Sequence, residues 1–152
     1  MRAIIQRVNQ ASVSINGNGF SKIQKGLLLF IGVELQDTLD DAFYLAKKIA
    51  ALRIFGDEAG QMNLSVHDIN AEILVVSQFT LHAQTRKGNR PSFILAARPE
   101  QAILLYEAFI SYIKDLSGCS VQTGKFGADM KVLLENDGPV TIFIDTKEVV
   151  LK

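Results

Sequence analysis

The sequence has few of the residues that build metal centres and disulfides. It contains one cysteine, Cys119, and two histidines, His67 and His82, spread along 152 residues. A single cysteine excludes an intrachain disulfide, and no Cys/His spacing typical of a zinc site occurs. We therefore predict no bound metal, no cofactor and a reducing cytoplasmic setting.

Neither an excess of one charge nor a long apolar run is present. Lys and Arg total 16, Asp and Glu total 16, and the pI is about 6.7. No global field attracts nucleic acid, so a polyanionic partner needs a local basic patch. The apolar runs have strand length and Gln6 and Arg7 interrupt the N-terminal stretch, so we expect no membrane-spanning helix and no signal peptide. The motifs GxSxG and GxxxxGK(S/T) are missing, which removes the usual cues for an α/β-hydrolase or a P-loop enzyme.

Strand patterns occupy both ends of the chain and its middle. Short apolar or alternating runs predict strands within residues 2–33 and over 71–79. Near the C-terminus, the stretch ENDGPVTIFID predicts a tight hairpin turn at Asp137-Gly138. Pro139 follows at once, where a returning strand should donate its backbone N–H, and proline has none. Local rules leave this proline unexplained.

Two helices separate these blocks of strands. Periodic apolar residues predict a helix that is capped by Asp37 or Thr38 and runs to about Phe55. Pro99 and Gly118 mark the start and end of the second helix. The sequence thus predicts a single domain over residues 1–152 of the α+β class, with two main helices and a curved antiparallel sheet or open β-barrel.

Hydroxyl side chains at the end of the middle strand offer two kinds of chemistry. In SQFTLHA, an extended backbone would point Thr80 and His82 the same way, as a nucleophile and its base. Alternatively, unpaired backbone N–H groups around Gln78 to Thr80 would stabilise an oxyanion without any nucleophilic side chain. Spacing alone favours an ordinary solvent-facing edge over the nucleophile–base pair, and it does not decide on the backbone donors.

A long polar loop follows, with the sequence TLHAQTRKGNRPSF. Arg86, Lys87 and Arg90 lie within five positions of one another and would bind phosphates. Phe79 and Phe93 flank these cations and would stack a base of single-stranded RNA. By composition a solvated loop is an equally good interpretation of the cations, and aromatic residues in such places are more often part of the core.

Three motifs in this order resemble the signature of the D-aminoacyl-tRNA deacylase family. They are SQFTL at Ser77–Leu81, RKGNRPSF at Arg86–Phe93 and NDGPVT at Asn136–Thr141. The resemblance extends along nearly the whole chain, including MRAIIQRVNQASV at the start and RIFGDEAGQMNLSV after the first predicted helix. Gln84 departs from the family pattern, because many relatives have an acidic residue at this place in the tRNA-facing loop.

The resemblance implies a cytoplasmic homodimer with no membrane contact and with active sites at the subunit interface. It implies hydrolysis of the ester that joins a D-amino acid to the terminal adenosine of tRNA, with mischarged glycyl-tRNA as a second substrate. The residues placed around the ester as catalytic are Ser77, Gln78, Phe79 and Thr80. Phe126 and Met130 would line the adenine or aminoacyl pocket, and Arg86, Lys87 and Arg90 would contact tRNA.

The resemblance also gives the Gly138-Pro139 pair a role. Its peptide bond would be cis, and the dipeptide of one subunit would enter the pocket of the other. Its backbone carbonyls would hold the substrate's α-ammonium and leave no space for an L side chain, because exchanging D for L exchanges the Cα hydrogen for the side chain. Because backbone atoms at this place would not contact the substrate's side chain, many D-amino acids would be accepted.

For the chemical step we favour the backbone. The ester lies beside a free ribose hydroxyl and is already labile, so orientation and oxyanion stabilisation by amides near Phe79 and Thr80 would suffice. The ribose hydroxyl would help to position or activate water. Two alternatives remain open at this stage: a non-catalytic RNA-binding module, and a hydrolase of small esters that uses Thr80 with His82 as its base.

Overall fold

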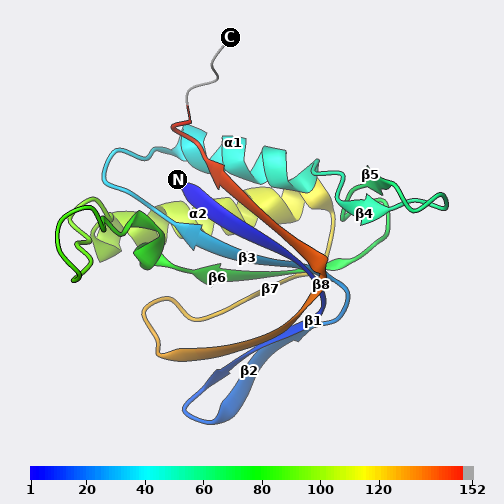
Figure 1. The fold of residues 1–152 in the computed structure, drawn as a ribbon, viewed down its shortest axis with the longest axis horizontal. Helices are drawn as coiled ribbons and strands as arrows, with labels where there is room; N and C mark the ends of the chain where they lie inside the picture. The colour runs from blue at the N-terminus through cyan, green and yellow to red at the C-terminus, as the bar shows by residue number, and fades with distance from the viewer. Residues whose placement is uncertain (149–152) are drawn as a thin grey trace.

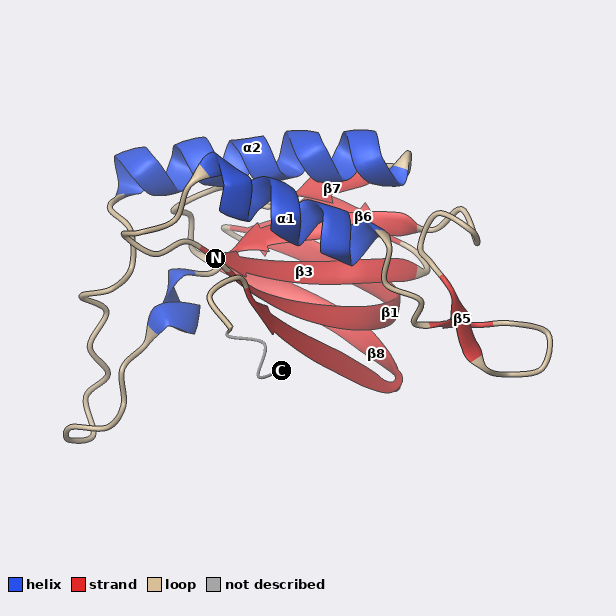
Figure 2. Cartoon of the chain, turned by 90° about the horizontal axis from the view of Figure 1, so that it is seen from above, coloured by secondary structure: helices blue, strands red, loops and turns tan. Residues whose placement is uncertain are grey.

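The computed structural model describes residues 1–148, so residues 149–152 of the predicted domain lie outside the described part (Figure 1). One curved sheet carries two helices on one face (Figure 2). The elements are β1 (Arg2–Ile15), β2 (Asn18–Ile23), β3 (Gly26–Gly32), α1 (Leu39–Ala50), β4 (Phe55–Gly56), β5 (Met62–Leu64), β6 (Glu72–Ser77), the 3-10 helix η1 (Phe79–His82), α2 (Pro99–Ser117), β7 (Val121–Thr123) and β8 (Met130–Asp145).

Strand β1 organises the sheet. One of its edges pairs with β3 over Arg2–Val8 and with β2 over Ala11–Ile15, and its other edge pairs with β8, all antiparallel. β3 continues to β6 and then to β7, and these two pairs are parallel. The predicted α+β class with two main helices and a curved, barrel-like sheet is confirmed. The sheet is mixed rather than antiparallel throughout, because α1 and α2 return the chain to the same end of the sheet and so allow parallel neighbours.

Both faces of the central strands are buried. Leu27 and Leu29 of β3 belong to the core beneath the helices, whereas Leu28 between them belongs to a second core on the opposite face. Successive side chains of a strand point to opposite faces. The curl of the sheet covers the second face, which explains why these strands are apolar without alternation.

The helix ends follow local signals in part. Thr38 caps α1, and its N–H donates to Asp41 Oδ2 at 2.9 Å in a capping box. The helix ends at Ala50, earlier than predicted, and Phe55 instead pairs with Leu64 in the β4–β5 hairpin. α2 begins at Pro99 and ends before Gly118, whose positive φ of 64° forms the expected left-handed cap. Neither helix, nor any other in residues 1–148, is long and apolar enough to cross a membrane.

The predicted hairpin at Asp137-Gly138 is wrong. β8 is one strand that pairs with β1 on both sides of this point: Glu135 opposes Gln10 and Thr141 opposes Gln6. Asp137–Val140 therefore forms a bulge, here called the β8 bulge, whose extra residues leave the ladder. Pro139 lies where no ladder bond is needed, which resolves its position. The Gly138-Pro139 peptide bond is cis, and both residues are exposed.

Candidate active site

A cavity of about 670 Å³ opens where β3 and β6 end. The start of α2 and the segment between β7 and β8 form its other walls, and its volume is that of a typical small-molecule site. Five of the predicted site residues line it together, from two separate parts of the sequence: Ser77, Gln78, Phe79, Phe126 and Met130. We call it the large cavity.

The segment after β6 turns abruptly. Ser77 is the last residue of β6, and the N–H of Gln78 still donates to Ile31 O at 2.8 Å. The chain then enters η1, in which Gln78 Nε2 donates to Thr80 Oγ1 at 2.5 Å. Thr80 is exposed and does not line the large cavity. Its hydroxyl is thus engaged with the adjacent amide rather than directed at a substrate.

Two backbone donors remain available at this turn. The N–H of Gln78 is taken by the neighbouring strand, and the N–H of Leu81 donates to Gln78 O. Within residues 1–148, the N–H groups of Phe79 and Thr80 meet no such acceptor. A short helix leaves its first N–H groups without an intrahelical partner, and such donors stabilise a developing oxyanion.

His82 does not act on Thr80. The extended geometry that would align the two side chains is wrong, because the segment is a 3-10 turn that exposes Thr80 and leaves His82 only 1% exposed. Its Nδ1 lies 3.6 Å from Glu34 Oε2, and neither ring nitrogen has a hydrogen-bond partner in the described chain. Gly32 permits this packing, since an added Cβ there would lie 3.0 Å from His82 Cδ2 and 2.9 Å from Gln78 O.

Aromatic rings form the walls of the large cavity. Phe79 and Phe93 meet edge to face with ring centroids 5.1 Å apart, and Phe126 packs against Tyr106 at 5.8 Å. The Tyr106 hydroxyl donates to Val75 O at 3.0 Å, and burial raises the pKa of Tyr106, which keeps it neutral. These walls suit a flat ring such as a nucleobase. Sequence reasoning found the phenylalanines but missed Tyr106, whose α2 position indicated only core.

The cations of the predicted tRNA-contacting loop lie outside the large cavity. Arg86, Lys87 and Arg90 are exposed on a loop. Two backbone hydrogen bonds between Gln84 and Ser92, of 2.8 and 3.0 Å, close the base of this loop. We call this segment the basic loop. A different cation, Arg98, lines the cavity itself. Sequence reasoning missed it, although its position immediately before Pro99 marked it as the residue at the start of α2.

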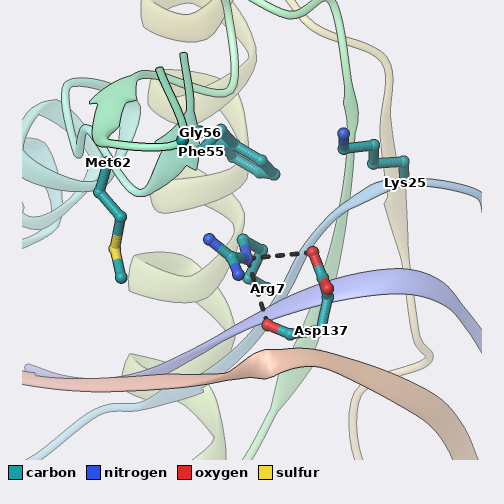
Figure 3. Close-up of a pocket in the computed structure, with 7 residues that line it drawn as sticks. Arg7, Lys25, Phe55, Gly56, Met62 and Asp137 are labelled. Carbon is teal, nitrogen blue, oxygen red and sulfur yellow. Dashed lines mark hydrogen bonds and ion pairs between the residues drawn. The ribbon is translucent and has the colours of Figure 1, made fainter. Parts of the chain in front are cut away.

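The β8 bulge lies far from the large cavity within one chain. Figure 1 shows the bend of β8 beside the β4–β5 hairpin and the η1 loop at the opposite end of the sheet. The bulge borders a second cavity of about 310 Å³ that Asp137, Arg7 and Lys25 help to line (Figure 3). Within one chain, Gly138 and Pro139 therefore lie apart from the predicted site residues that line the large cavity.

Arg7 holds the bulge in place. Its Nε donates to Asp137 O and lies near Asp137 Oδ2, both at 3.2 Å (Figure 3). Its Nη1 donates to Ile54 O at 2.7 Å. The guanidinium thereby joins β1, the bulge and the segment before β4. Gly138 has a φ of 125°, and a Cβ there would lie 2.9 Å from Arg7 Nη2. Only glycine suits this conformation and this contact.

Comparison with known proteins gives close relatives over the full length. A protein of Flavobacterium psychrophilum named D-aminoacyl-tRNA deacylase is 59% identical over 97% of this chain and 98% of its own length. One of the same name from Thermosipho melanesiensis is 54% identical over 98% and 99%. A solved structure titled c-Myc DNA Unwinding Element Binding Protein matches with a TM-score of 0.90 and 42% identity, over 95% of this chain and 98% of that one.

A more distant structure shows how far the fold extends. The structure of a probable eukaryotic D-amino acid tRNA deacylase superposes with a TM-score of 0.81 at 16% identity, over 94% of this chain and 97% of that one. At this identity the likeness concerns the fold alone. The sequence model of the family described as D-Tyr-tRNA(Tyr) deacylase matches residues 4–145, which include the large cavity, the basic loop and the β8 bulge. The chain belongs to the D-Tyr-tRNA(Tyr) deacylase family.

Proposed function

We propose that the protein hydrolyses the ester that joins a D-amino acid to the terminal adenosine of tRNA, and also that of mischarged glycyl-tRNA, in the cytoplasm. The observation that carries the proposal is the large cavity, which gathers Ser77, Gln78, Phe79, Phe126 and Met130 around a volume of about 670 Å³. Relatives that are 54–59% identical are named D-aminoacyl-tRNA deacylase. An ester-linked nucleoside matches both the aromatic walls and the free backbone donors.

Catalysis rests on the backbone at the start of η1. The N–H groups of Phe79 and Thr80 would bind the oxyanion that forms when water attacks the ester carbonyl. The attacking water loses a proton and the departing ribose oxygen gains one, and the adjacent ribose hydroxyl would relay this proton between them. Within residues 1–148, the one carboxylate that lines the cavity, Asp129, is paired with Lys131. His82 is buried whereas Thr80 is exposed, so this geometry speaks against an esterase that uses Thr80 with His82 as its base.

The chiral filter requires a second copy of the chain. Gly138 and Pro139 lie at the end of the sheet opposite the large cavity, so only a partner's bulge would complete the site. Exposed apolar side chains on β8 support such an interface: Leu133 is 72% exposed and Phe143 55%. In the homodimer, carbonyls of the inserted bulge would bind the α-ammonium and exclude an L side chain, while glycine would pass.

The basic loop would track the tRNA backbone. Arg86, Lys87 and Arg90 form no ion pair with any residue in the described chain, and they are exposed for phosphate contacts. Binding through the loop is electrostatic, so it should weaken as salt increases.

One assay tests the proposal. The protein is incubated with matched D-aminoacyl-, L-aminoacyl- and glycyl-tRNA and with a small chromogenic ester, and released amino acid is measured. We expect release from the D form and from glycyl-tRNA, with the L form intact. Binding without release would indicate an RNA-binding module, and turnover of the small ester without chiral preference would indicate a simple esterase; either result contradicts the proposal.

A further inference from the structure

Arg98 occupies a fixed place at the rim of the large cavity. It is the last residue before α2, with an extended backbone at φ −65° and ψ 155°. Pro99 then fixes the first helical position, so the chain has little freedom there. The Arg98 side chain lines the same cavity as Ser77, Gln78 and Phe79.

The charge of Arg98 is not compensated. Two charged side chains line the large cavity, Arg98 and Asp129. Asp129 pairs with Lys131, whose Nζ lies 2.9 Å from Asp129 Oδ1. The guanidinium of Arg98 forms no ion pair with residues 1–148. The cavity therefore has one available positive charge in walls that are otherwise largely apolar.

A terminal nucleotide brings one negative group to this cavity. Its 5′-phosphate is joined through O5′ and C5′ to the same ribose that carries the ester, so a few covalent bonds limit the distance between the two groups. Aromatic walls such as Phe79, Phe93 and Phe126 provide no partner for a phosphate, which is costly to desolvate unpaired. A planar guanidinium binds phosphate oxygens in a bidentate manner.

We propose that Arg98 binds the phosphate on the 5′ side of the terminal adenosine and thereby sets the register of the ester against the free N–H groups of η1. The proposal rests on the proposed function, because it takes the large cavity as the nucleotide site. Arg98 is a positioning residue: it contacts the nucleotide, not the reacting carbonyl. Arg98 would bind this one phosphate, whereas the basic loop, which lies outside the cavity, would contact more distant phosphates.

Stable analogues test the proposal without turnover. In 3′-deoxy-3′-(D-aminoacylamino)adenosine an amide replaces the ester, and the compound is prepared with and without a 5′-phosphate. Calorimetry gives the Kd of both for the wild type, Arg98→Ala and Arg98→Lys. We expect the phosphate to tighten wild-type binding about tenfold or more, the value of a charge-assisted hydrogen bond. Arg98→Ala should abolish this gain, and Arg98→Lys should restore part of it.

The matched control is Lys114→Ala, which removes a cation at the other end of the same helix, roughly 24 Å away. It should keep the full phosphate gain. Comparing two ligands on one preparation cancels any loss of folded protein. Two results would overturn the proposal. One is a phosphate gain in Arg98→Ala equal to that of the wild type, and the other is failure of both analogues to bind the wild type.

A separate measurement distinguishes this failure from failure of the proposed function. If wild-type protein releases D-amino acid from D-aminoacyl-tRNA but Arg98→Ala retains the phosphate gain, only the role of Arg98 fails. If wild-type protein releases nothing, the proposed function fails first. Free D-amino acid, as the product, can also be tested as an inhibitor. If it inhibits Arg98→Ala less than the wild type while the phosphate gain is retained, Arg98 binds the product carboxylate, and the phosphate site is contradicted.

Discussion

The large cavity and the β8 bulge both present backbone groups, but different forces hold those groups in place. At the cavity, apolar and aromatic side chains surround N–H donors at the start of η1. At the bulge, one guanidinium bonds to Asp137 and Ile54 and leaves the Gly138-Pro139 segment exposed. Donors suit a developing negative charge and carbonyls suit an ammonium, so under the proposed function the two regions would complement opposite ends of an aminoacyl group.

The largest effect should come from Gly138→Ala. The φ of 125° and the 2.9 Å approach to Arg7 Nη2 leave no room for a methyl group. We expect kcat/KM for D-aminoacyl-tRNA to fall by about 10- to 100-fold, the equivalent of the strain at such positions. Gly19→Ala, where a Cβ meets nothing within 4 Å, is the control. Full activity in Gly138→Ala would show that the bulge does not approach the substrate.

Arg7→Ala should have the next largest effect and should separate the two regions. It removes the donors to Asp137 O and Ile54 O, so we expect a loss of about 1–3 kcal/mol in the free energy of unfolding. Chiral selection should weaken more than turnover, because the η1 donors are untouched. The ratio of the rates of D- and L-aminoacyl-tRNA hydrolysis measures chiral selection, and a urea melt measures the free energy of unfolding. An unchanged ratio in folded protein would contradict the role of Arg7 in holding the β8 bulge.

A change remote from both regions should affect stability alone. Burial by itself would raise the pKa of Asp41, but hydrogen bonds from Thr146, Thr38 and Lys147 outweigh it and hold the pKa well below its usual range. A lowered folded-state pKa adds stability that is present above the unfolded pKa of about 4 and is lost as the pH falls below it.

Asp41→Asn should therefore lose roughly 1–2 kcal/mol at pH 7, and its difference from the wild type should narrow as the pH falls below about 4, with kcat/KM unchanged. Urea melts from pH 7 to pH 3 measure the difference. A gap that stays constant over this range would contradict the assignment of the effect to the charged carboxylate.

The smallest effect should come from Thr80→Val. The Thr80 hydroxyl accepts from Gln78 Nε2 and does not line the large cavity. We expect kcat to stay within about fivefold, because removing one exposed hydrogen bond costs about 1 kcal/mol. Thr80→Ser retains the hydroxyl and serves as the matched variant. Complete loss of turnover in Thr80→Val, with binding intact and Thr80→Ser active, would return the chemistry to the side chain.

Sequence reasoning succeeded where a local rule was enough. Pro99, Gly118 and Thr38 mark helix ends because fixed or left-handed φ values and a capping hydroxyl act within one turn. It was wrong for Asp137-Gly138, which has the composition of a hairpin turn but lies in a bulge. It was also wrong for the Thr80–His82 alignment, which assumed that the strand continues. At Asp137-Gly138, pairing with the distant strand β1 overrode the local preference. At Thr80 the chain leaves β6 and forms a 3-10 turn.

The sequence by itself determined the α+β class, the two helices, the motifs of the family and five of the residues that share the large cavity. Tertiary structure alone decided that β8 continues past Pro139, because β1 supplies partners on both sides of the bulge. It alone brought Arg98 to the cavity that Ser77 lines, since η1 and the basic loop separate the end of β6 from the start of α2 in the sequence. Backbone preferences act over a few residues, whereas contacts between distant segments depend on how the whole core packs.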